Sequence, residues 1–257
     1  MIAPESAGVR VVGLPGVPEV TAGDDLVALT LKAVQASQLT VERGDVFVYT
    51  QKIVSKAEAC YVRLDDVSPS DLARQWGDAW GKDPRVIELV LQDAARIVRM
   101  DRGVVITETR HGFVCANSGV DTSNVRPGWA TRLPADPDAS ARQLCERLRT
   151  ALDMPVGVII SDTFGRPWRD GQTNVAIGVA GLHAITDYRG TADVQGQPLR
   201  ATAIAVADEL ASAAELVMGK TLAIPVAIVK GTGLGVSRLE DGSGRDLLRR
   251  ADEDMFR

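Results

Sequence analysis

Two acidic segments each follow an apolar run, and their side chains are of the types that bind hard divalent cations. "SDTFGRPWRDGQTNVAIG" (161–178) places Asp162 and Thr163 directly after "VGVII", and "GVDTSN" places Asp121 and Asn124 after "GFVCA". Ligand sites commonly lie where strands of mixed α and β proteins end. Mg²⁺ and Mn²⁺ prefer carboxylate, hydroxyl and phosphate oxygens. The two segments therefore predict a metal-phosphate site, provided that folding brings them together.

The same residue types also have an ordinary structural explanation. An Asp or Ser that follows a strand is often a turn former or a helix N-cap. Sequence spacing does not show that the two segments meet, because they lie far apart along the chain. The metal-phosphate site and the structural role are both carried forward as hypotheses.

Basic residues near these segments could bind a phosphate. "TQKIVSKAE" places Lys52 and Lys56 four residues apart after the apolar run "DVFVYT". A lysine ammonium is a suitable point charge for phosphate, although a solvated basic turn has the same composition. Arg166 and Arg169 could clamp a carboxylate or a phosphate, or could pair with Asp170 at the surface. Both interpretations of these arginines remain open.

Other chemistries find little support. His111 and His183 are too few and too far apart for a metal triad, and no G-x-S-x-G motif indicates a nucleophilic serine. "AELVMGKT" ends like a phosphate-binding P-loop, but Ala214 stands where that motif requires glycine. "GTGLGV" (231–236) follows an apolar run as a dinucleotide motif should, yet Val236 replaces its third glycine. We therefore interpret this segment as a flexible turn.

The composition restricts the class of partner. The formal net charge is -5, which offers no general attraction to nucleic acid or to acidic membranes. No basic stretch leads into an apolar segment at the start, and no uninterrupted apolar run is long enough to span a bilayer. Cys60, Cys115 and Cys145 are widely spaced and outside any C-x-x-C motif, which disfavours disulfides and structural zinc. We expect a cytoplasmic protein with reduced thiols and no nucleic-acid or membrane partner.

The spacing of apolar residues predicts the elements that must position these side chains. Strands are expected at 9–14, 45–50, 96–100, 103–109, 112–116, 156–160 and 225–231, and helices at 24–36, 136–153 and 203–219. Ser68 is the expected N-cap of a further helix, with Pro69 at its first position and Asp71 in its first turn. Another helix should begin near Pro84. The region 68–97 is more charged and helical than its flanks and could form a subdomain.

The sequence alone thus supports mixed α and β structure, with a β-α-β unit at its start. Four segments, in order and spread over nearly the whole chain, resemble the coenzyme F420-0:L-glutamate ligase family: "GVPEV", "TQKIVSKAE", "GVDTSNV" and "SDTFGRPWRDGQTNVAIGVAG". The resemblance implies an α+β fold particular to this family, with mixed sheets, two subdomains and assembly as a homodimer. It implies a single ligase domain over 1–257, without the nitroreductase-like flavin domain of two-domain bacterial members.

The resemblance also implies an activity. This is GTP-dependent and divalent-metal-dependent attachment of L-glutamate to the lactyl carboxylate of F420-0 through an acyl phosphate, followed by further γ-linked glutamates. GTP is then a co-substrate, Mg²⁺ or Mn²⁺ the metal, and K⁺ a further candidate cation. The family's nucleotide-binding positions fall on Val17, Pro18, Glu19, Val20, Gln51, Lys52, Lys56, Asn124, Met218 and Gly219. Its metal-binding positions fall on Asp121, Asp162 and Thr163.

One position departs from the family pattern. Lys220 stands where the pattern of archaeal relatives has a glutamine metal ligand. A protonated lysine has no lone pair, so we expect Lys220 to contact phosphate instead of metal.

Two other classes of protein remain as alternatives. One is a non-catalytic, nucleotide- or phosphate-binding regulatory module. The other is a dinucleotide-dependent oxidoreductase that would rest on "GTGLGV". Neither accounts for the two acidic segments.

Overall fold

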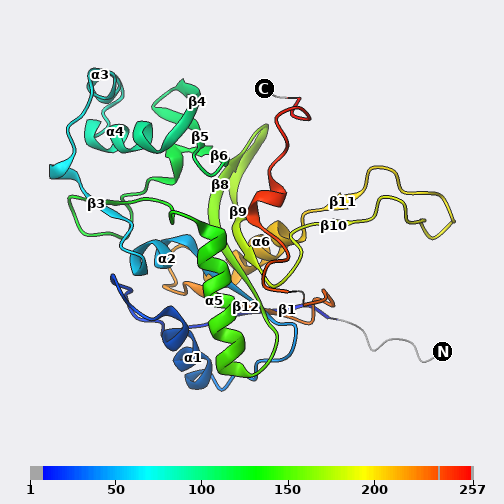
Figure 1. Cartoon of the computed structure of the whole chain (residues 1–257). Coiled ribbons are helices and arrows are strands. Elements are labelled where there is room, and N and C mark those ends of the chain that lie inside the picture. The colour runs from blue at the N-terminus through cyan, green and yellow to red at the C-terminus, as the bar shows by residue number, and fades with distance from the viewer. Residues whose placement is uncertain (1–7, 237, 256–257) are drawn as a thin grey trace.

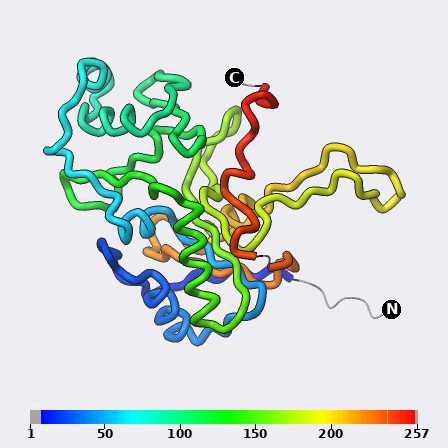
Figure 2. The backbone as a smooth tube through the Cα atoms, in the orientation of Figure 1, coloured from blue at the N-terminus to red at the C-terminus, as the bar shows by residue number. Residues whose placement is uncertain are grey.

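The computed structural model describes residues 8–236 and 238–255, and a five-stranded sheet lies at its centre (Figure 1; Figure 2). In spatial order its strands are β1 (Arg10–Gly13), β12 (Val226–Lys230), β2 (Val46–Thr50), β8 (Gly157–Arg166) and β9 (Arg169–Ala180). β2 and β8 are parallel, and the other neighbouring pairs are antiparallel. β1, β2 and β8 therefore run in one direction and end toward the same edge of the sheet.

Helices cover both faces of this sheet. In β2, Phe47 and Tyr49 pack into one core cluster, whereas Val46 and Val48 pack into another. The first cluster includes apolar residues of α1 (Leu26–Ala36) and α5 (Pro137–Leu152), and the second includes those of α6 (Val206–Met218). Successive side chains of a strand point to opposite faces, so an uninterrupted apolar strand is what a sheet covered on both faces requires.

A second group of elements lies to one side of this sheet and packs around its own apolar cluster, which runs from Leu64 to Ala130 (Figure 1). It contains the short turn η1 (Leu64–Asp66), α3 (Asp71–Trp80), α4 (Pro84–Asp93), the antiparallel sheet of β4 (Ala94–Asp101), β5 (Val104–Thr109) and β6 (Val114–Ala116), and the antiparallel pair β3 (Tyr61–Arg63) and β7 (Trp129–Thr131). The helical region expected at 68–97 contains both helices, but the cluster extends well beyond it.

Most of the expected elements are confirmed to within a few residues, and mixed α and β structure is confirmed with them. The N-cap prediction is wrong: Ser70, not Ser68, caps α3, and its Oγ accepts a hydrogen bond from the Ala73 N–H at 3.3 Å. Pro69 therefore precedes the helix, whereas Asp71 is in its first turn as expected. The first two strands flank α1 as predicted, but β12 lies between them in the sheet.

The polar segment that follows "VGVII" is not a loop. β8 continues to Arg166, and Arg169 of β9 pairs with it across a tight turn, so that 157–180 form one long hairpin. Its first half is buried and apolar, and its second half is polar because it leaves the part of the sheet that helices cover. Polar residues on a strand that is only partly covered resemble a loop when they are read from the sequence alone.

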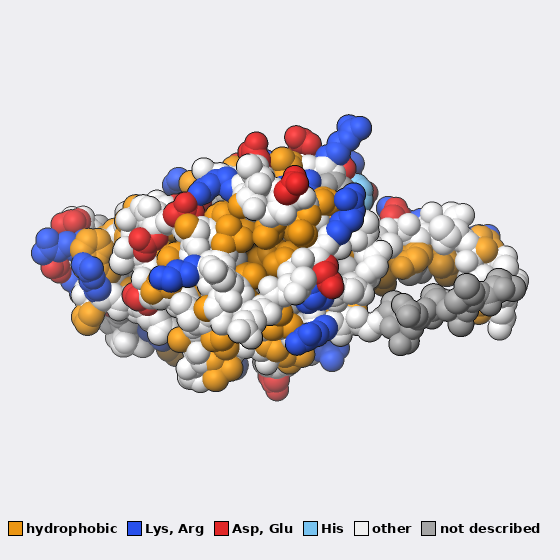
Figure 3. Space-filling model, turned by 90° about the horizontal axis from the view of Figure 1, so that it is seen from below, with side chains coloured by type: hydrophobic (Ala, Val, Ile, Leu, Met, Phe, Trp, Pro, Cys, Tyr) orange, Lys and Arg blue, Asp and Glu red, His pale blue; other side chains and the backbone are white. Residues whose placement is uncertain are grey.

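An arm formed by residues 188–202 extends away from the body (Figure 1; Figure 2). The short strands β10 (Thr186–Asp187) and β11 (Ala203–Ile204) pair at its base. The view in Figure 3 shows the arm on one side and a central group of apolar side chains bordered by charged ones. Within the described part of the chain, no helix has the length and apolar character needed to cross a bilayer. Part of the N-terminal segment used to judge a leader sequence, residues 1–7, lies outside the described residues.

Two carboxylates, one buried and one half-buried, accept hydrogen bonds from backbone N–H groups on the outer edge of β9. Asp138, in the first turn of α5, accepts hydrogen bonds from Val179 N–H at 3.0 Å and from Gly244 N–H at 2.7 Å. Its other oxygen accepts from Ser243 Oγ at 2.5 Å, which fastens the turn η3 (Gly244–Leu247) to this edge. Farther along, Asp208 of α6 accepts from Ala176 N–H at 2.8 Å. An open strand edge is thereby closed by side chains, which also blocks pairing with another chain there.

The first prediction concerns Asp138. We expect Asp138→Ala to lower the free energy of unfolding by about 3 kcal/mol, because two buried N–H groups lose their acceptor. Asp138→Asn keeps one carbonyl oxygen and should lose less. Denaturant unfolding followed by circular dichroism measures both. Asp78→Ala, at an exposed position of α3, is the control and should change stability by no more than about 0.5 kcal/mol. Equal effects of the two alanine variants would contradict this role of Asp138.

Candidate active site

A cavity of about 850 Å³ lies at the edge where β1, β2 and β8 end. The segment after β1, the helix α2 (Gln51–Ala57) that follows β2, and the outer half of β8 form part of its wall. The segment that leads from α6 into β12 closes a second side, and residues 115–124 of the second group of elements close a third. The cavity thus forms where two separately packed groups of elements meet.

Twelve of the residues assigned to the site from the sequence line this cavity: Val17, Pro18, Glu19, Val20, Gln51, Lys52, Lys56, Asp121, Asn124, Asp162, Thr163 and Gly219. The structure therefore brings the two acidic segments together, which sequence spacing could not establish. Met218 is the exception among the assigned residues, because it is fully buried in the core beneath α6 and does not line the cavity. The binding roles of all these residues stay predictions.

Arg166 and Arg169 lie at the exposed tip of the β8–β9 hairpin and do not line the cavity. Arg166 donates a hydrogen bond from Nη2 to the carbonyl oxygen of Asp170 at 3.0 Å. This contact is to the backbone of Asp170, so it differs from the side-chain ion pair that the sequence suggested as one alternative.

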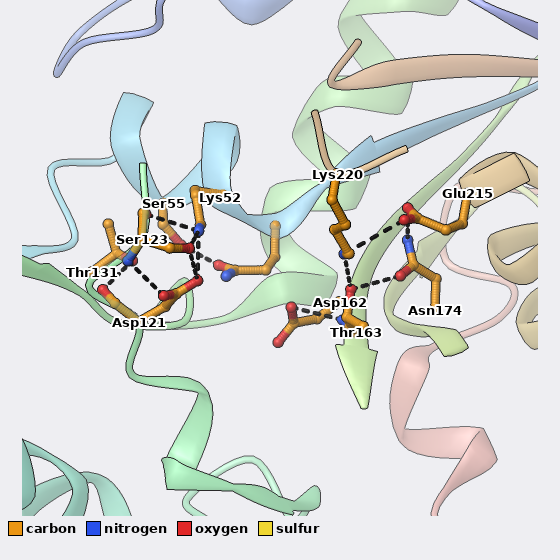
Figure 4. A network of polar contacts seen from close by, with 11 residues as sticks. Lys52, Ser55, Asp121, Ser123, Thr131, Asp162, Thr163, Asn174, Glu215 and Lys220 are labelled. Atoms are coloured by element: carbon orange, nitrogen blue, oxygen red, sulfur yellow. Dashed lines mark hydrogen bonds and ion pairs between the residues drawn. The ribbon is translucent and has the colours of Figure 1, made fainter. Parts of the chain in front are cut away.

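On one side of the cavity, Lys52 and Asp121 form an ion pair across the two groups of elements (Figure 4). Lys52 Nζ donates to Asp121 Oδ2 at 2.5 Å and to Ser123 Oγ at 2.7 Å. Asp121 Oδ1 accepts from the Ser123 N–H at 2.7 Å. Burial acts to raise the pKa of Asp121, but the hydrogen bonds from Lys52 and Ser123 outweigh it and hold the pKa below its ordinary value. Asp121 is therefore ionised throughout the neutral range.

Asp162 lies between the two sides of the cavity (Figure 4). Its pKa is shifted in the opposite direction to that of Asp121. Its Oδ1 accepts from the Thr163 N–H at 2.8 Å, and no described residue donates a hydrogen bond to Oδ2. Desolvation is the main cause that raises its pKa to about 6, with a further contribution from the negative charge of Asp121. Cys115 lies on the same wall, and burial, followed by the charge of Asp162, raises the pKa of its thiol to about 12.

The other side carries a polar network that the sequence analysis did not find (Figure 4). Thr163 Oγ1 donates to Asn174 Oδ1 at 2.7 Å, and Asn174 Nδ2 donates to Glu215 Oε2 at 3.1 Å. Lys220 closes the network, because its Nζ donates to Thr163 Oγ1 and lies 3.6 Å from Glu215 Oε1. Thr163 and Asn174 are direct partners in the β8–β9 register. A correct prediction of this hairpin would have located Asn174, whereas no local signal marks Glu215.

The environment of Lys56 differs from the solvated turn that the sequence offered as one alternative. The solvated basic turn is wrong as an interpretation, because Lys56 is on α2 and its side chain is only 7% exposed. Its ammonium forms an ion pair with Glu19, whose side chain is 78% exposed. A nearly buried lysine that lines a cavity and has one exposed acidic partner can exchange that partner for a phosphate.

The carboxylates fit one divalent ion that is carried with a nucleotide. Among the described residues, no group of three or more His, Cys, Asp and Glu side chains is placed to hold a metal. Mg²⁺ commonly binds through one or two carboxylates together with substrate phosphates and water, so a protein cage is not required. Asp162 offers a free oxygen, and Asp121 keeps part of the acceptor capacity of Oδ1. These two residues would hold the ion.

The chain was then compared with known proteins. Residues 16–231 match the family described as F420-0:Gamma-glutamyl ligase. The chain belongs to this family. A relative from Methanothermobacter thermautotrophicus named coenzyme F420:L-glutamate ligase is 44% identical over 251 residues, which are 97% of this chain and 99% of the relative. Relatives of the same name from Methanopyrus kandleri and Methanocaldococcus jannaschii are each 43% identical, over 96% and 86% of this chain and 97% and 88% of the relative.

The span that matches the F420-0:gamma-glutamyl ligase family contains every residue assigned to the site, from Val17 to Lys220. It also contains Asn174 and Glu215, which only the structure brought to notice. The resemblance that the four sequence segments suggested is thus confirmed at the level of the family.

The second prediction concerns the pH dependence of stability without metal. The pKa of Asp162 is about 6 in the folded protein, above its ordinary value of 3.8, so folding disfavours the charged form. The stability that the protonated carboxyl contributes is fully present below pH 3.8 and is lost as the pH rises through 6. Asp162→Asn cannot ionise and should be more stable than the wild type by about 3 kcal/mol at pH 7.5.

Urea unfolding in the presence of a chelator, at pH values from 4 to 8, measures this difference. The two proteins should converge near pH 4. Asp121→Asn is the matched control with the opposite sign, because it removes the partner of Lys52 and should destabilise the protein at pH 7.5. A difference between wild type and Asp162→Asn that does not change with pH would contradict the raised pKa.

Proposed function

We propose that this chain is a GTP-dependent ligase that joins the amino group of L-glutamate to the lactyl carboxylate of F420-0, and then adds further glutamates through γ-linkages. The observation that carries the proposal is that one cavity is lined by twelve residues from separate parts of the chain, to which the resemblance assigns nucleotide and metal binding. The names of the relatives support the choice of acceptor and amino acid.

A carboxylate does not condense with an amine in water until one of its oxygens becomes a leaving group. In the proposed reaction a lactyl carboxylate oxygen attacks the γ-phosphorus of GTP, the bond to the β-phosphate oxygen breaks, and GDP leaves. The amine of glutamate then attacks the acyl phosphate, phosphate leaves with the former carboxylate oxygen, and the amine proton passes to solvent. No covalent bond to the protein is needed, consistent with the absence of a recognised nucleophile motif in the sequence.

The cavity provides the charges that such a transfer needs. Three lysines of the described chain line the cavity: Lys52, Lys56 and Lys220. Their positive charges can balance the negative charge of a triphosphate. Asp162 and Asp121 would hold Mg²⁺ or Mn²⁺, which when bound supplies Lewis-acid charge to the phosphate oxygens. The hydrogen bond of Lys52 keeps Asp121 ionised and fixed in orientation. Positioning and electrostatics, without a protein nucleophile, are the usual means of phosphoryl transfer.

The resemblance adds further expectations that belong to this proposal. They are a homodimer, K⁺ as an additional cation and a cytoplasmic location. The oxidoreductase alternative is disfavoured, because among the described residues "GTGLGV" follows β12 without an α-helix after it, and it does not line the cavity that holds the acidic segments. A regulatory module that binds a nucleotide without catalysis is distinguished from the ligase by product formation.

The third prediction tests the proposal directly. The wild-type protein incubated with F420-0, L-glutamate, GTP and Mn²⁺ should give deazaflavin products that increase by successive glutamate masses, and ATP should replace GTP poorly. Asp162→Asn and Asp121→Asn should reduce the rate at least about 100-fold, because the metal's charge stabilisation is lost. High Mn²⁺ should restore part of it. Mass spectrometry of the products is the measurement.

Asp78→Asn, at an exposed position on α3, is the control for this assay and should be fully active. Near-normal turnover by Asp162→Asn at low Mn²⁺ would contradict the metal role of Asp162. If the protein binds or hydrolyses GTP but forms no glutamate product, the ligase hypothesis is contradicted and the regulatory module is supported. Equal turnover with ATP would remove the preference for guanine but not the reaction.

The fourth prediction concerns Lys56. Lys56→Met keeps most of the apolar stem of the buried side chain and removes its charge. The loss of a charged hydrogen bond to phosphate should weaken the binding of a non-hydrolysable GTP analogue about 10- to 100-fold. Calorimetric titration measures the affinity, and Lys82→Met, at an exposed position, is the control. Unchanged affinity in folded Lys56→Met would show that the pair with Glu19 is only structural.

A further inference from the structure

We infer that Lys220 is a resident cation of this site, which takes the place of a second divalent ion beside Thr163, so that the chain binds one divalent metal for each nucleotide. The inference rests on the proposed function and deepens it. It extends the expectation from the sequence, which was that Lys220 contacts phosphate instead of metal.

The first support is the geometry around Thr163. The single hydroxyl proton of Thr163 goes to Asn174 Oδ1, at 2.7 Å, so the lone pairs of Oγ1 are its remaining means of contact. The ammonium of Lys220 donates to this oxygen. A divalent ion on the same hydroxyl would lie next to the positive charge of Lys220, and like charges repel. Thr163 can bind the lysine or a metal, and the structure places the lysine there.

The second support is the balance of charge along the cavity. Asp121 is neutralised by Lys52 at 2.5 Å, and Glu215 is next to Lys220 at 3.6 Å. Asp162 is the cavity-wall carboxylate that forms no ion pair with any described residue. One unpaired carboxylate, together with the oxygens of a triphosphate, supplies the negative charge and the ligands that one divalent ion needs. Once Asp162 binds the first ion, no unpaired carboxylate of the described cavity wall is left for a second one.

The third support is the way the backbone presents Lys220. α6 ends at Met218, which is fully buried and fixes the end of the helix. Gly219 has φ of +55°, a conformation that glycine adopts without strain, and it turns the chain so that Lys220 points into the cavity (Figure 4). The ammonium of Lys220 has three N–H donors, so it can keep its hydrogen bond to Thr163 and also donate to a phosphate oxygen when a nucleotide enters. A flexible point charge suits a group that is being transferred.

The test counts metal ions. Wild type, Lys220→Gln and Lys220→Met are each saturated with a non-hydrolysable GTP analogue and titrated with Mn²⁺, and electron paramagnetic resonance of free Mn²⁺ gives the number bound per chain. We expect one ion for the wild type. Lys220→Gln removes the charge and adds a carbonyl oxygen, so it should bind a second ion at higher Mn²⁺. Lys220→Met removes the charge without adding a ligand and should bind one ion only.

Ligase turnover against Mn²⁺ concentration provides a second readout. Both variants should lose at least tenfold in rate at low Mn²⁺, and only Lys220→Gln should recover as Mn²⁺ rises. Lys32→Gln, at an exposed position of α1, is the control and should match the wild type in both measurements. Two ions bound by the wild type would overturn the inference, as would wild-type stoichiometry and rate in Lys220→Gln.

The outcomes separate this inference from the proposed function. Suppose that the wild type binds the analogue with one Mn²⁺, and Lys220→Gln with two, while neither makes a glutamate product. This result would support the inference and contradict the proposed ligase activity. If the wild type makes the glutamate product and binds two Mn²⁺, the ligase activity is supported and the inference about Lys220 is contradicted.

Discussion

Thr50 of β2 pairs with Ser161 of β8 in parallel register, and the site depends on this pairing. Parallel strands bring their carboxyl ends to one edge of a sheet. The helix that follows β2 carries Lys52 and Lys56, and the next residues of β8 are Asp162 and Thr163, so this register alone sets two cations beside a carboxylate and a hydroxyl. β12 runs the opposite way and begins at this edge, which brings the segment after α6 into the same space.

The three cavity lysines and the carboxylates form a partly cancelled set of charges. Lys52, Lys56 and Lys220 each have an acidic neighbour, whereas Asp162 forms no ion pair with a described residue and is held in a desolvated position. An unpaired carboxylate with a raised pKa reduces the stability of the empty protein at neutral pH. Ligand charge can relieve this cost, which gives a physical reason for the site to be more stable when occupied.

The sequence predicted the strongly patterned parts of the fold, and most of the residues that it assigned to the site line the cavity. β2 and α5 were located because an apolar run or a helical period repeats over many residues. The outer half of β8 was missed because it is polar and only partly covered, and with it the register that places Asn174 opposite Thr163. Glu215 was missed because a helix in the second core cluster supplies it from far along the chain. The buried position of the Met218 side chain was not foreseen, because a list of positions does not show which way a side chain points.

Cys115 on the cavity wall has a chemical consequence for the proposed intermediate. An acyl phosphate is readily captured by a thiolate, which would give a thioester to the protein and end turnover. With a pKa of about 12, only about one Cys115 side chain in 10⁵ is a thiolate at pH 7. Burial and the negative charge of Asp162 therefore keep a nearby nucleophile inactive. In the proposed reaction, an acyl phosphate would then survive long enough for the amine of glutamate to reach it.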